Sequence, residues 1–141
     1  MRIFLDANIL FSAAKSDGAV RRLLRRLADD GHQCAVDAFV SEEARRNVAA
    51  KAPEAMQVLE TLLSSMPRVD AHAGELSPDA ALLLPEKDRP VLAAAIRQGC
   101  AALVTGDSTH FGALYGKTIQ GVVIHSPRSL AVTLLRGADV R

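Results

Sequence analysis

Four acidic residues are placed where their side chains could share one ligand. Asp6 and Asp107 come at the ends of short apolar runs that are typical of buried strands. Glu43 and Asp88 lie near the expected starts of two helices. In open α/β sheets a ligand binds outside the carboxyl ends of the strands. If the strands of Asp6 and Asp107 are neighbours, all four carboxylates can therefore converge on one edge of the sheet.

Carboxylates that crowd into a crevice need a partner of opposite charge. Like charges a few ångströms apart raise one another's pKa, and a buried unpaired carboxylate is costly. A divalent cation removes both problems, and an all-oxygen ligand set suits Mg²⁺ or Mn²⁺ better than zinc. A water on such an ion can be ionised to attack a phosphodiester, and a second ion can stabilise the leaving oxygen. The pattern therefore favours metal-assisted hydrolysis of RNA or DNA.

Each of these acids also has a purely structural interpretation. Asp6 could cap the helix that follows it, and Asp107 could form an ordinary turn with its own backbone. Asp88 could be only a helix N-cap, and Glu43 could lie on a solvated helix face beside Glu42. The hydrolytic hypothesis therefore depends on the four residues as a set.

Strand-like and helix-like segments alternate along the whole chain. We expect strands over residues 2–5, 34–36, 67–69, 101–105 and 120–124. We expect helices over 8–14, over about 17–30, after Ser41 as N-cap, from Pro53, over 77–84, from 87 or 88 to 98, and over 127–137. Such alternation predicts a three-layer α/β domain with a mainly parallel sheet.

The charge balance limits how the chain could hold a nucleic acid. Its 141 residues, which suit one domain, include 17 Lys and Arg against 16 Asp and Glu, and the sequence pI is about 7.9. Domains that bind nucleic acid over a broad face usually have a pI above about 9. Any such role must therefore depend on a local basic patch.

Arginines in two of the expected helices could form that patch. Five of them could contact phosphates along a track toward the acids: Arg22, Arg25, Arg26, Arg45 and Arg46. The alternative is an ordinary solvated helix face. Phosphate contacts position a strand without reading its sequence, and the few aromatic residues offer little surface for base stacking.

The sequence also indicates in which cellular compartment the protein is expected. No run approaches the roughly 18 apolar residues of a membrane span. An acid at the sixth position argues against a signal peptide. The two cysteines, Cys34 and Cys100, have apolar flanks and are too few for a disulfide framework. We therefore expect buried free thiols and a cytoplasmic protein.

Four motifs together resemble the PIN-domain family of metal-dependent ribonucleases, and most closely its small bacterial VapC-like toxins. The motifs are IFLDANIL with Asp6, SEEARRN with Glu43, DRPVLAAA with Asp88, and LVTGDSTHF with Asp107. Glu43 precedes a basic pair as the family's second acid does, and Glu42 stays an alternative. Each motif is short, so their order along nearly the whole chain gives the specificity.

The resemblance implies a fold, an activity and partners. The sheet order would be 3-2-1-4-5, which makes the strands of Asp6 and Asp107 neighbours. The chain would cleave RNA with one or two Mg²⁺ or Mn²⁺ ions held by the four acids. It would be the toxin of a toxin–antitoxin pair, bind a cognate antitoxin protein and form homodimers. Asn8, Thr105 and Ser108 could orient a carboxylate or a metal-bound water, although each also suits a turn or a cap.

Several features leave other interpretations open. The apolar stretch Leu82–Pro85 departs from the family's pattern and could cover the site or bind a partner. A catalytically degenerate module of the same fold could bind a protein or RNA. A phosphatase-like enzyme with Asp6 as nucleophile is disfavoured, because Asn8 stands where such enzymes carry a second acid. His110 could meet a phosphate, but a histidine at a helix start is more often structural.

Overall fold

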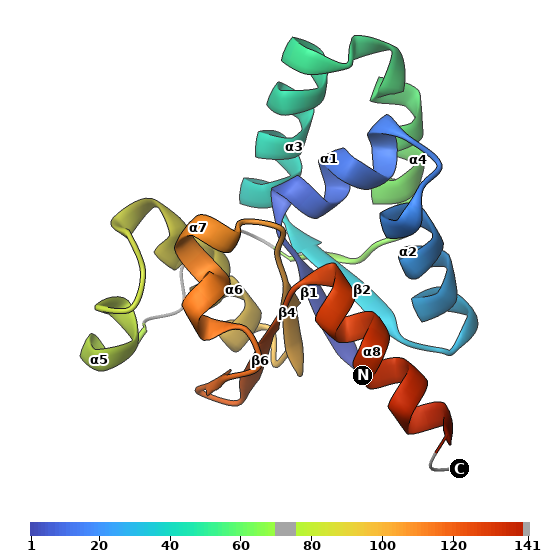
Figure 1. Cartoon of the computed structure of the whole chain (residues 1–141). Helices are drawn as coiled ribbons and strands as arrows, with labels where there is room; N and C mark the ends of the chain where they lie inside the picture. Colours follow the sequence, from blue (N-terminus) through green and yellow to red (C-terminus); the bar gives the residue numbers. More distant parts are fainter. Residues whose placement is uncertain (70–75, 140–141) are drawn as a thin grey trace.

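The computed structural model describes residues 1–69 and 76–139 of the chain (Figure 1). The strands are β1 (Arg2–Leu5), β2 (Gln33–Asp37), β3 (Arg68–Val69), β4 (Ala102–Val104), β5 (Thr118–Ile119) and β6 (Val122–His125). The helices are α1 (Ala7–Lys15), α2 (Ala19–Asp29), α3 (Ala38–Lys51), α4 (Met56–Ser64), α5 (Pro78–Ala81), α6 (Arg89–Arg97), α7 (Ser108–Phe111) and α8 (Pro127–Asp139). Short 3-10 turns cover Pro53–Ala55, Glu86–Asp88 and Gly112–Leu114.

The strands form one sheet in the order β3-β2-β1-β4-β6-β5. All neighbours are parallel except β5 and β6, which are antiparallel. The expected order is therefore confirmed for the five parallel strands, with β6 as the fifth. The extra edge strand β5 was not predicted. Gln120 and Gly121, expected to begin the last strand, instead form the tight turn between β5 and β6, with φ of 48° and 87°.

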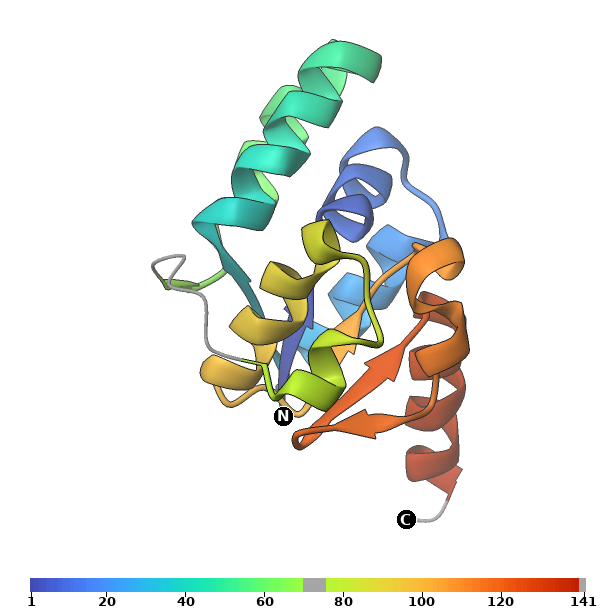
Figure 2. The same ribbon diagram turned by 90° about the vertical axis from the view of Figure 1, so that its left-hand side faces the viewer.

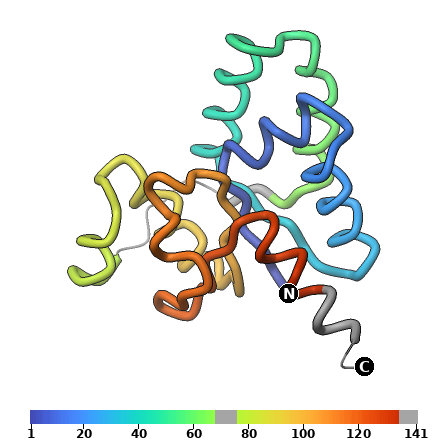
Figure 3. The backbone as a smooth tube through the Cα atoms, in the orientation of Figure 1, coloured from blue at the N-terminus to red at the C-terminus, as the bar shows by residue number. Residues whose placement is uncertain are grey.

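Helices cover both faces of the sheet. Helix α6 lies against one face, and α2 and α8 lie against the other (Figures 1 and 2). Because both faces are covered, the central strand β1 is apolar throughout its buried part: Ile3, Phe4 and Leu5 are fully buried. Helices α3 and α4 form an antiparallel hairpin that packs on α1 (Figure 3). This three-layer arrangement confirms the expected fold class.

Helix α3 begins earlier than the sequence indicated. Ser41 is not its N-cap: Asp37, the last residue of β2, caps the helix by accepting a hydrogen bond from the Val40 amide at 3.0 Å. Ser41 lies inside the helix, and its hydroxyl donates to the Asp37 carbonyl at 2.8 Å. An acid that ends a strand and caps the next helix leaves no loop between them, so the sequence pattern of a separate cap was misleading.

Two other helix ends also differ from expectation. Helix α5 stops at Ala81 rather than near Leu84. The amides of Leu83 and Leu84 bond three residues back, to the carbonyls of Ala80 and Ala81, so the segment tightens into 3-10-type turns before Pro85. The Arg89 guanidinium holds the segment that follows α5 by donating to the carbonyls of Ala81 and Leu84. Helix α8 continues to Asp139, past the expected end at Gly137. A glycine inside a helix costs only about 1 kcal/mol, so it need not end one.

The cap at Asp37 gives a first testable expectation. Replacing Asp37 by alanine removes the acceptor of the Val40 amide, and we expect a loss of about 1–2 kcal/mol in the free energy of unfolding. Asp37→Asn should keep most of the stability, because asparagine caps as well as aspartate. Urea unfolding of the three proteins measures the effect. Equal stability of Asp37→Ala and Asp37→Asn would show that the hydrogen bond to the Val40 amide does not stabilise the start of α3.

Both cysteines are free thiols, as expected, but only Cys100 is fully buried. Cys34 is half-buried, Cys100 is buried, and neither is in a disulfide. Burial raises the pKa of both thiols to about 11, which keeps them protonated and unreactive at neutral pH. Over residues 1–69 and 76–139, every helix falls short of the length and apolar character that crossing a bilayer demands.

Candidate metal centre

A cavity of about 410 Å³ opens at the carboxyl ends of β1 and β4. All four acids named from the sequence line it: Asp6, Glu43, Asp88 and Asp107. They come from the end of β1, the middle of α3, the start of α6 and the start of α7. Strands β1 and β4 pair with Leu5 beside Val104, which brings the residues that follow them together at one edge. Glu42 is exposed and does not line the cavity, so the geometry favours Glu43.

Asp6 is buried and held by three hydrogen-bond donors. Its Oδ1 accepts from the Ala7 amide at 2.8 Å, so Asp6 does cap α1. Its Oδ2 accepts from the Thr105 hydroxyl at 2.8 Å and from the Asn8 amide nitrogen at 3.3 Å. The Asn8 Oδ1 in turn accepts from the Gly106 amide at 2.8 Å, which ties the start of α1 to the end of β4. The capping and site interpretations of Asp6 are therefore compatible.

The environment of Asp6 makes its ionised form expensive. Desolvation by burial is the largest cause that raises the pKa of Asp6 above 3.8, and hydrogen bonds from Thr105 and Ala7 oppose it. The charges of Glu43 and Asp88 raise this pKa further. A cavity-lining carboxylate whose pKa stays raised despite three hydrogen-bond donors marks a candidate functional site.

Thr105 connects the two strand-end acids. Its hydroxyl donates to Asp6 and accepts from the Asp107 amide at 3.1 Å, and the residue is fully buried. The Tyr115 hydroxyl donates to the Thr105 carbonyl at 2.8 Å. Desolvation and the charges of Asp107 and Asp6 raise the pKa of Tyr115, which keeps it a neutral donor. Thr105 and Tyr115 therefore fix the geometry between the carboxylates.

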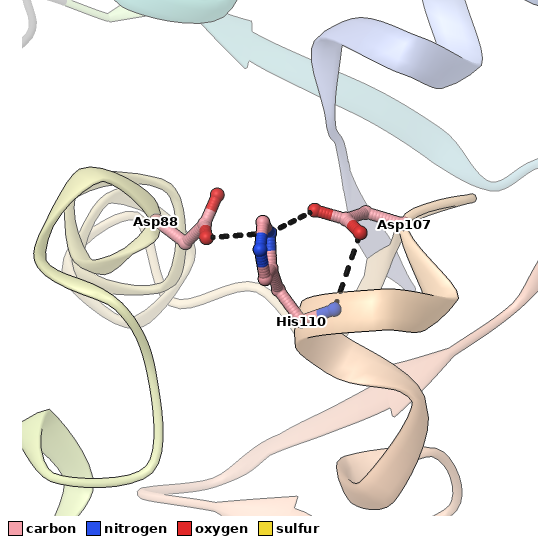
Figure 4. Close-up of side chains that lie close together, drawn as sticks. All are labelled: Asp88, Asp107 and His110. Atoms are coloured by element: carbon pink, nitrogen blue, oxygen red, sulfur yellow. Dashed lines mark hydrogen bonds and ion pairs between the residues drawn. The ribbon is translucent and has the colours of Figure 1, made fainter.

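His110 lies between Asp88 and Asp107 (Figure 4). Its Nδ1 is 2.7 Å from Asp107 Oδ2 and 3.1 Å from Asp88 Oδ2. Asp107 caps α7 by accepting from the His110 amide at 3.2 Å, so the cap interpretation of Asp107 also holds. Asp88 occupies the N-cap position of α6 without a capping hydrogen bond from its side chain. Its Oδ2 is buried and accepts no hydrogen bond from the part of the chain that the structure describes.

These residues fit a divalent cation. The lining of the cavity holds four acidic residues and one lysine, Lys87, so acidic residues outnumber basic ones there. Asp88 Oδ2 is a buried acceptor that lies 3.1 Å from His110 Nδ1 but accepts no hydrogen bond from the described residues, and a cation would satisfy it. Carboxylate oxygens are the ligands that Mg²⁺ and Mn²⁺ prefer. The charge balance and the Asp88 oxygen that accepts no hydrogen bond from the described residues show that this group of side chains could hold a metal ion.

Comparison with known proteins supports the fold. No family model and no curated protein matches the sequence. Solved structures do match. A chain of VapBC2 from Rickettsia felis, solved bound to a promoter DNA fragment, has a TM-score of 0.62 and 19% identity over 89% of this chain and 98% of its own. A chain of VapBC-1 from nontypeable Haemophilus influenzae has a TM-score of 0.61 and 12% identity over 91% and 99%. A chain of a toxin–antitoxin complex from Klebsiella pneumoniae has a TM-score of 0.58 and 22% identity over 86% and 95%.

The chain has a PIN-like fold. The resemblance seen in the four sequence motifs therefore extends to the arrangement of nearly the whole chain in space. The PIN-like fold places the ends of β1 and β4 side by side, which explains why acids about a hundred residues apart share one cavity. At these levels of identity the comparison concerns the fold, and the chemistry of the site depends on the residues themselves.

Of the residues expected to assist the acids, some contact them and others lie outside the cavity lining. Asn8 and Thr105 bind Asp6 directly, as described above. Ser108 is exposed as the first residue of α7 and lies outside the cavity lining. The five arginines on α2 and α3 also lie outside it. Three of them bind acids elsewhere: Arg25 binds Asp17, Arg26 binds Asp30 and Arg45 binds Glu60.

Other residues of the site were not identified from the sequence. The additional lining side chains include Phe39, Asn47, Lys87 and Val91. Asn47 is one helical turn after Glu43, a spacing that could have revealed it. Lys87 directly precedes Asp88, but nothing in the sequence distinguishes it from other lysines. The apolar stretch Leu82–Pro85 does not line the cavity, so it does not cover the site; binding of a partner there stays a prediction.

Proposed function

We propose that this chain is a Mg²⁺- or Mn²⁺-dependent endoribonuclease and the toxin of a toxin–antitoxin pair. One observation carries the proposal: four acidic residues from four separate segments line one cavity, where a buried oxygen of Asp88 accepts no hydrogen bond from residues 1–69 and 76–139. The toxin role is supported by structural neighbours that are themselves parts of toxin–antitoxin complexes. A cognate antitoxin, an RNA substrate, a single functional domain and a homodimer belong to the same proposal.

In the proposed activity, each residue of the site has a defined task. Asp6, Glu43, Asp88 and Asp107 would hold the ion. When bound, such an ion supplies activation of water and stabilisation of negative charge on the phosphate. Thr105 and Asn8 orient Asp6 through hydrogen bonds.

Contacts to the RNA backbone complete the proposal. Lys87, which lines the cavity, is suited to bind a phosphate of the substrate. Arg22, Arg25, Arg26, Arg45 and Arg46 would contact RNA on surfaces away from the cavity wall. Because these are contacts to phosphates, substrate binding should weaken as salt is added.

A non-catalytic binding module is the alternative, and metal affinity distinguishes the two. A module that only binds a partner gains nothing from a desolvated acid such as Asp6 beside other carboxylates, because the arrangement is costly without an ion. The direct test is incubation of the purified chain with structured RNAs in the presence and absence of Mg²⁺ or Mn²⁺. Cleavage that survives EDTA, or the absence of both cleavage and metal binding, would reject the proposal.

The two adjacent glutamates of α3 form a matched pair of variants. Glu43 lines the cavity and Glu42 is exposed outside it. We expect Glu43→Gln to weaken Mn²⁺ binding about tenfold or more and to reduce cleavage, because one carboxylate of the centre is lost. Glu42→Gln makes the same chemical change one residue away and should behave like the wild type. Isothermal titration with Mn²⁺ measures both, and equal effects of the two changes would contradict the assignment of Glu43.

A further inference from the structure

The position of His110 suggests that the centre is not built of oxygen ligands alone. One ring nitrogen, Nδ1, faces Asp107 at 2.7 Å and Asp88 at 3.1 Å. The side chain is mostly buried, with 28% of it exposed. In Figure 4 the ring lies between the two carboxyl groups, which approach from α7 and from the start of α6. Ligand-type atoms of these three residues all lie within 4.8 Å of one another.

Local structure fixes this orientation of the ring. Asp107 caps α7, and the His110 amide binds its Oδ1. The ring folds back toward the same carboxyl group, so that Asp107 holds both the amide and Nδ1. The histidine is therefore already positioned toward the acids before any ion binds. Asp88, which directly precedes α6, lies on the other side of the imidazole ring and completes the group (Figure 4).

The hydrogen bonds of the three residues leave one acceptor unsatisfied. A proton on Nδ1 that points at Asp107 cannot also point at Asp88, and Asp88 Oδ2 accordingly accepts no hydrogen bond from the residues that the structure describes. A divalent cation would satisfy both carboxylate oxygens. The neutral imidazole with its proton on Nε2 instead of Nδ1 would then offer the Nδ1 lone pair as a third ligand atom. Nitrogen ligands favour first-row transition ions, whereas Mg²⁺ strongly prefers oxygen.

We propose that His110 is a ligand of this centre, and that its nitrogen makes the centre favour first-row transition ions such as Mn²⁺ over Mg²⁺. The inference rests on the proposed function only in requiring a divalent ion at the acids. It does not depend on what that ion does to RNA. It narrows the expected cofactor from either ion to Mn²⁺ or a related transition ion.

Pulsed electron paramagnetic resonance of the Mn²⁺-loaded full chain tests the ligand directly. We expect modulation from a directly bound ¹⁴N nucleus in the wild type and its loss in His110→Ala. The matched control is His32→Ala. His32 directly precedes β2, so it lies at the amino ends of the parallel strands, whereas the acids lie at the carboxyl ends. Its Nδ1 is 3.0 Å from the N-terminal amine. That control should keep the nitrogen signal.

Competition between the two ions tests the selectivity. His110→Ala should weaken Mn²⁺ binding about tenfold or more and change Mg²⁺ binding by less than about threefold. Equal losses for both ions would overturn the proposal. If His110→Ala does not fold, wild-type protein labelled with [¹⁵N]histidine decides: the ¹⁴N modulation must be replaced by that of ¹⁵N, and its persistence would reject a histidine ligand.

The failure of this inference can be distinguished from the failure of the proposed function. Mn²⁺ that binds without any nitrogen coupling overturns the role of His110 and leaves a carboxylate-held centre intact. A wild-type chain that binds neither Mn²⁺ nor Mg²⁺ overturns both. Nitrogen coupling together with an absence of RNA cleavage supports His110 as a ligand and rejects only the nuclease.

Discussion

Asp6→Asn should strongly reduce metal-dependent RNA cleavage and, in the absence of metal, remove a cost to the stability of the folded protein that grows as pH rises. Asp6 is the most buried of the four acids, and its carboxylate faces the charges of Glu43 and Asp88. Removing one negative charge from the centre takes away a ligand and should lower the cleavage rate on the order of 10²–10³-fold. The same change also removes the cost of ionising a buried group, so activity and metal-free stability should move in opposite directions.

The stability effect has a defined dependence on pH. The pKa of Asp6 is raised above 3.8 in the folded protein, so folding disfavours its ionised form. Below pH 3.8 the carboxyl group is protonated in both states and carries no penalty. As pH rises through the folded pKa, the wild type loses stability, at about 1.4 kcal/mol for each unit by which the pKa is raised. The advantage of Asp6→Asn should therefore grow from acidic to neutral pH.

Thermal unfolding in EDTA measures this advantage. For a chain of this size about 1 kcal/mol shifts the melting temperature by about 3–5 °C, so a rise of a few degrees at neutral pH is expected. The amide oxygen of asparagine can still accept from the Ala7 amide, which preserves the cap of α1. Its NH2 group would face the Thr105 hydroxyl and the Asn8 amide nitrogen, which donate to Asp6 in the wild type, and this mismatch offsets part of the gain. Added Mn²⁺ should stabilise the wild type and leave Asp6→Asn unchanged. An Asp6→Asn protein that is less stable than the metal-free wild type at neutral pH would contradict the argument.

The strand-end acids could be predicted because local sequence reports them. An apolar run that stops at an acid marks both a buried strand and its carboxyl end, and parallel strands bring such ends to one edge. Asp6 and Asp107 needed only that inference. The order 3-2-1-4-5 that the family resemblance implied then made β1 and β4 neighbours, and the structure has them paired. The part of the site formed by the residues that follow β1 and β4 could therefore be predicted from the sequence.

Contacts between distant helices could not be predicted in the same way. His110 and Asp88 meet across the gap between α7 and α6, and no spacing in the sequence encodes that approach. Tyr115 reaches back ten residues to the Thr105 carbonyl through a turn of irregular backbone. Asp37 was missed as a cap because it belongs to a strand, and Ser41, a good capping type, follows close behind. Tertiary packing decides such details, and it overrides local preference.

Thr105→Val should damage the centre although it changes no proposed ligand. Valine has nearly the shape of threonine but lacks the hydroxyl that donates to Asp6 and accepts from the Asp107 amide. Loss of that group leaves polar partners unsatisfied in a fully buried position, at a cost of about 1–3 kcal/mol in the free energy of unfolding. The carboxylates also lose their relative orientation, so Mn²⁺ affinity should fall about 10–100-fold.

Thr105→Ser separates the hydroxyl from the packing of the methyl group. It removes the methyl group, which costs on the order of 1 kcal/mol in stability, but keeps the donor to Asp6. If the hydroxyl matters through Asp6, Thr105→Ser retains Mn²⁺ affinity while Thr105→Val loses it, even where the two are equally destabilised. The Thr105 hydroxyl also lowers the pKa of Asp6, so in Thr105→Val metal binding should begin at a higher pH than in Thr105→Ser. Equal affinities and equal pH profiles in the two variants would reduce Thr105 to a packing residue, and Asp6 would then be oriented by Asn8 and the Ala7 amide alone.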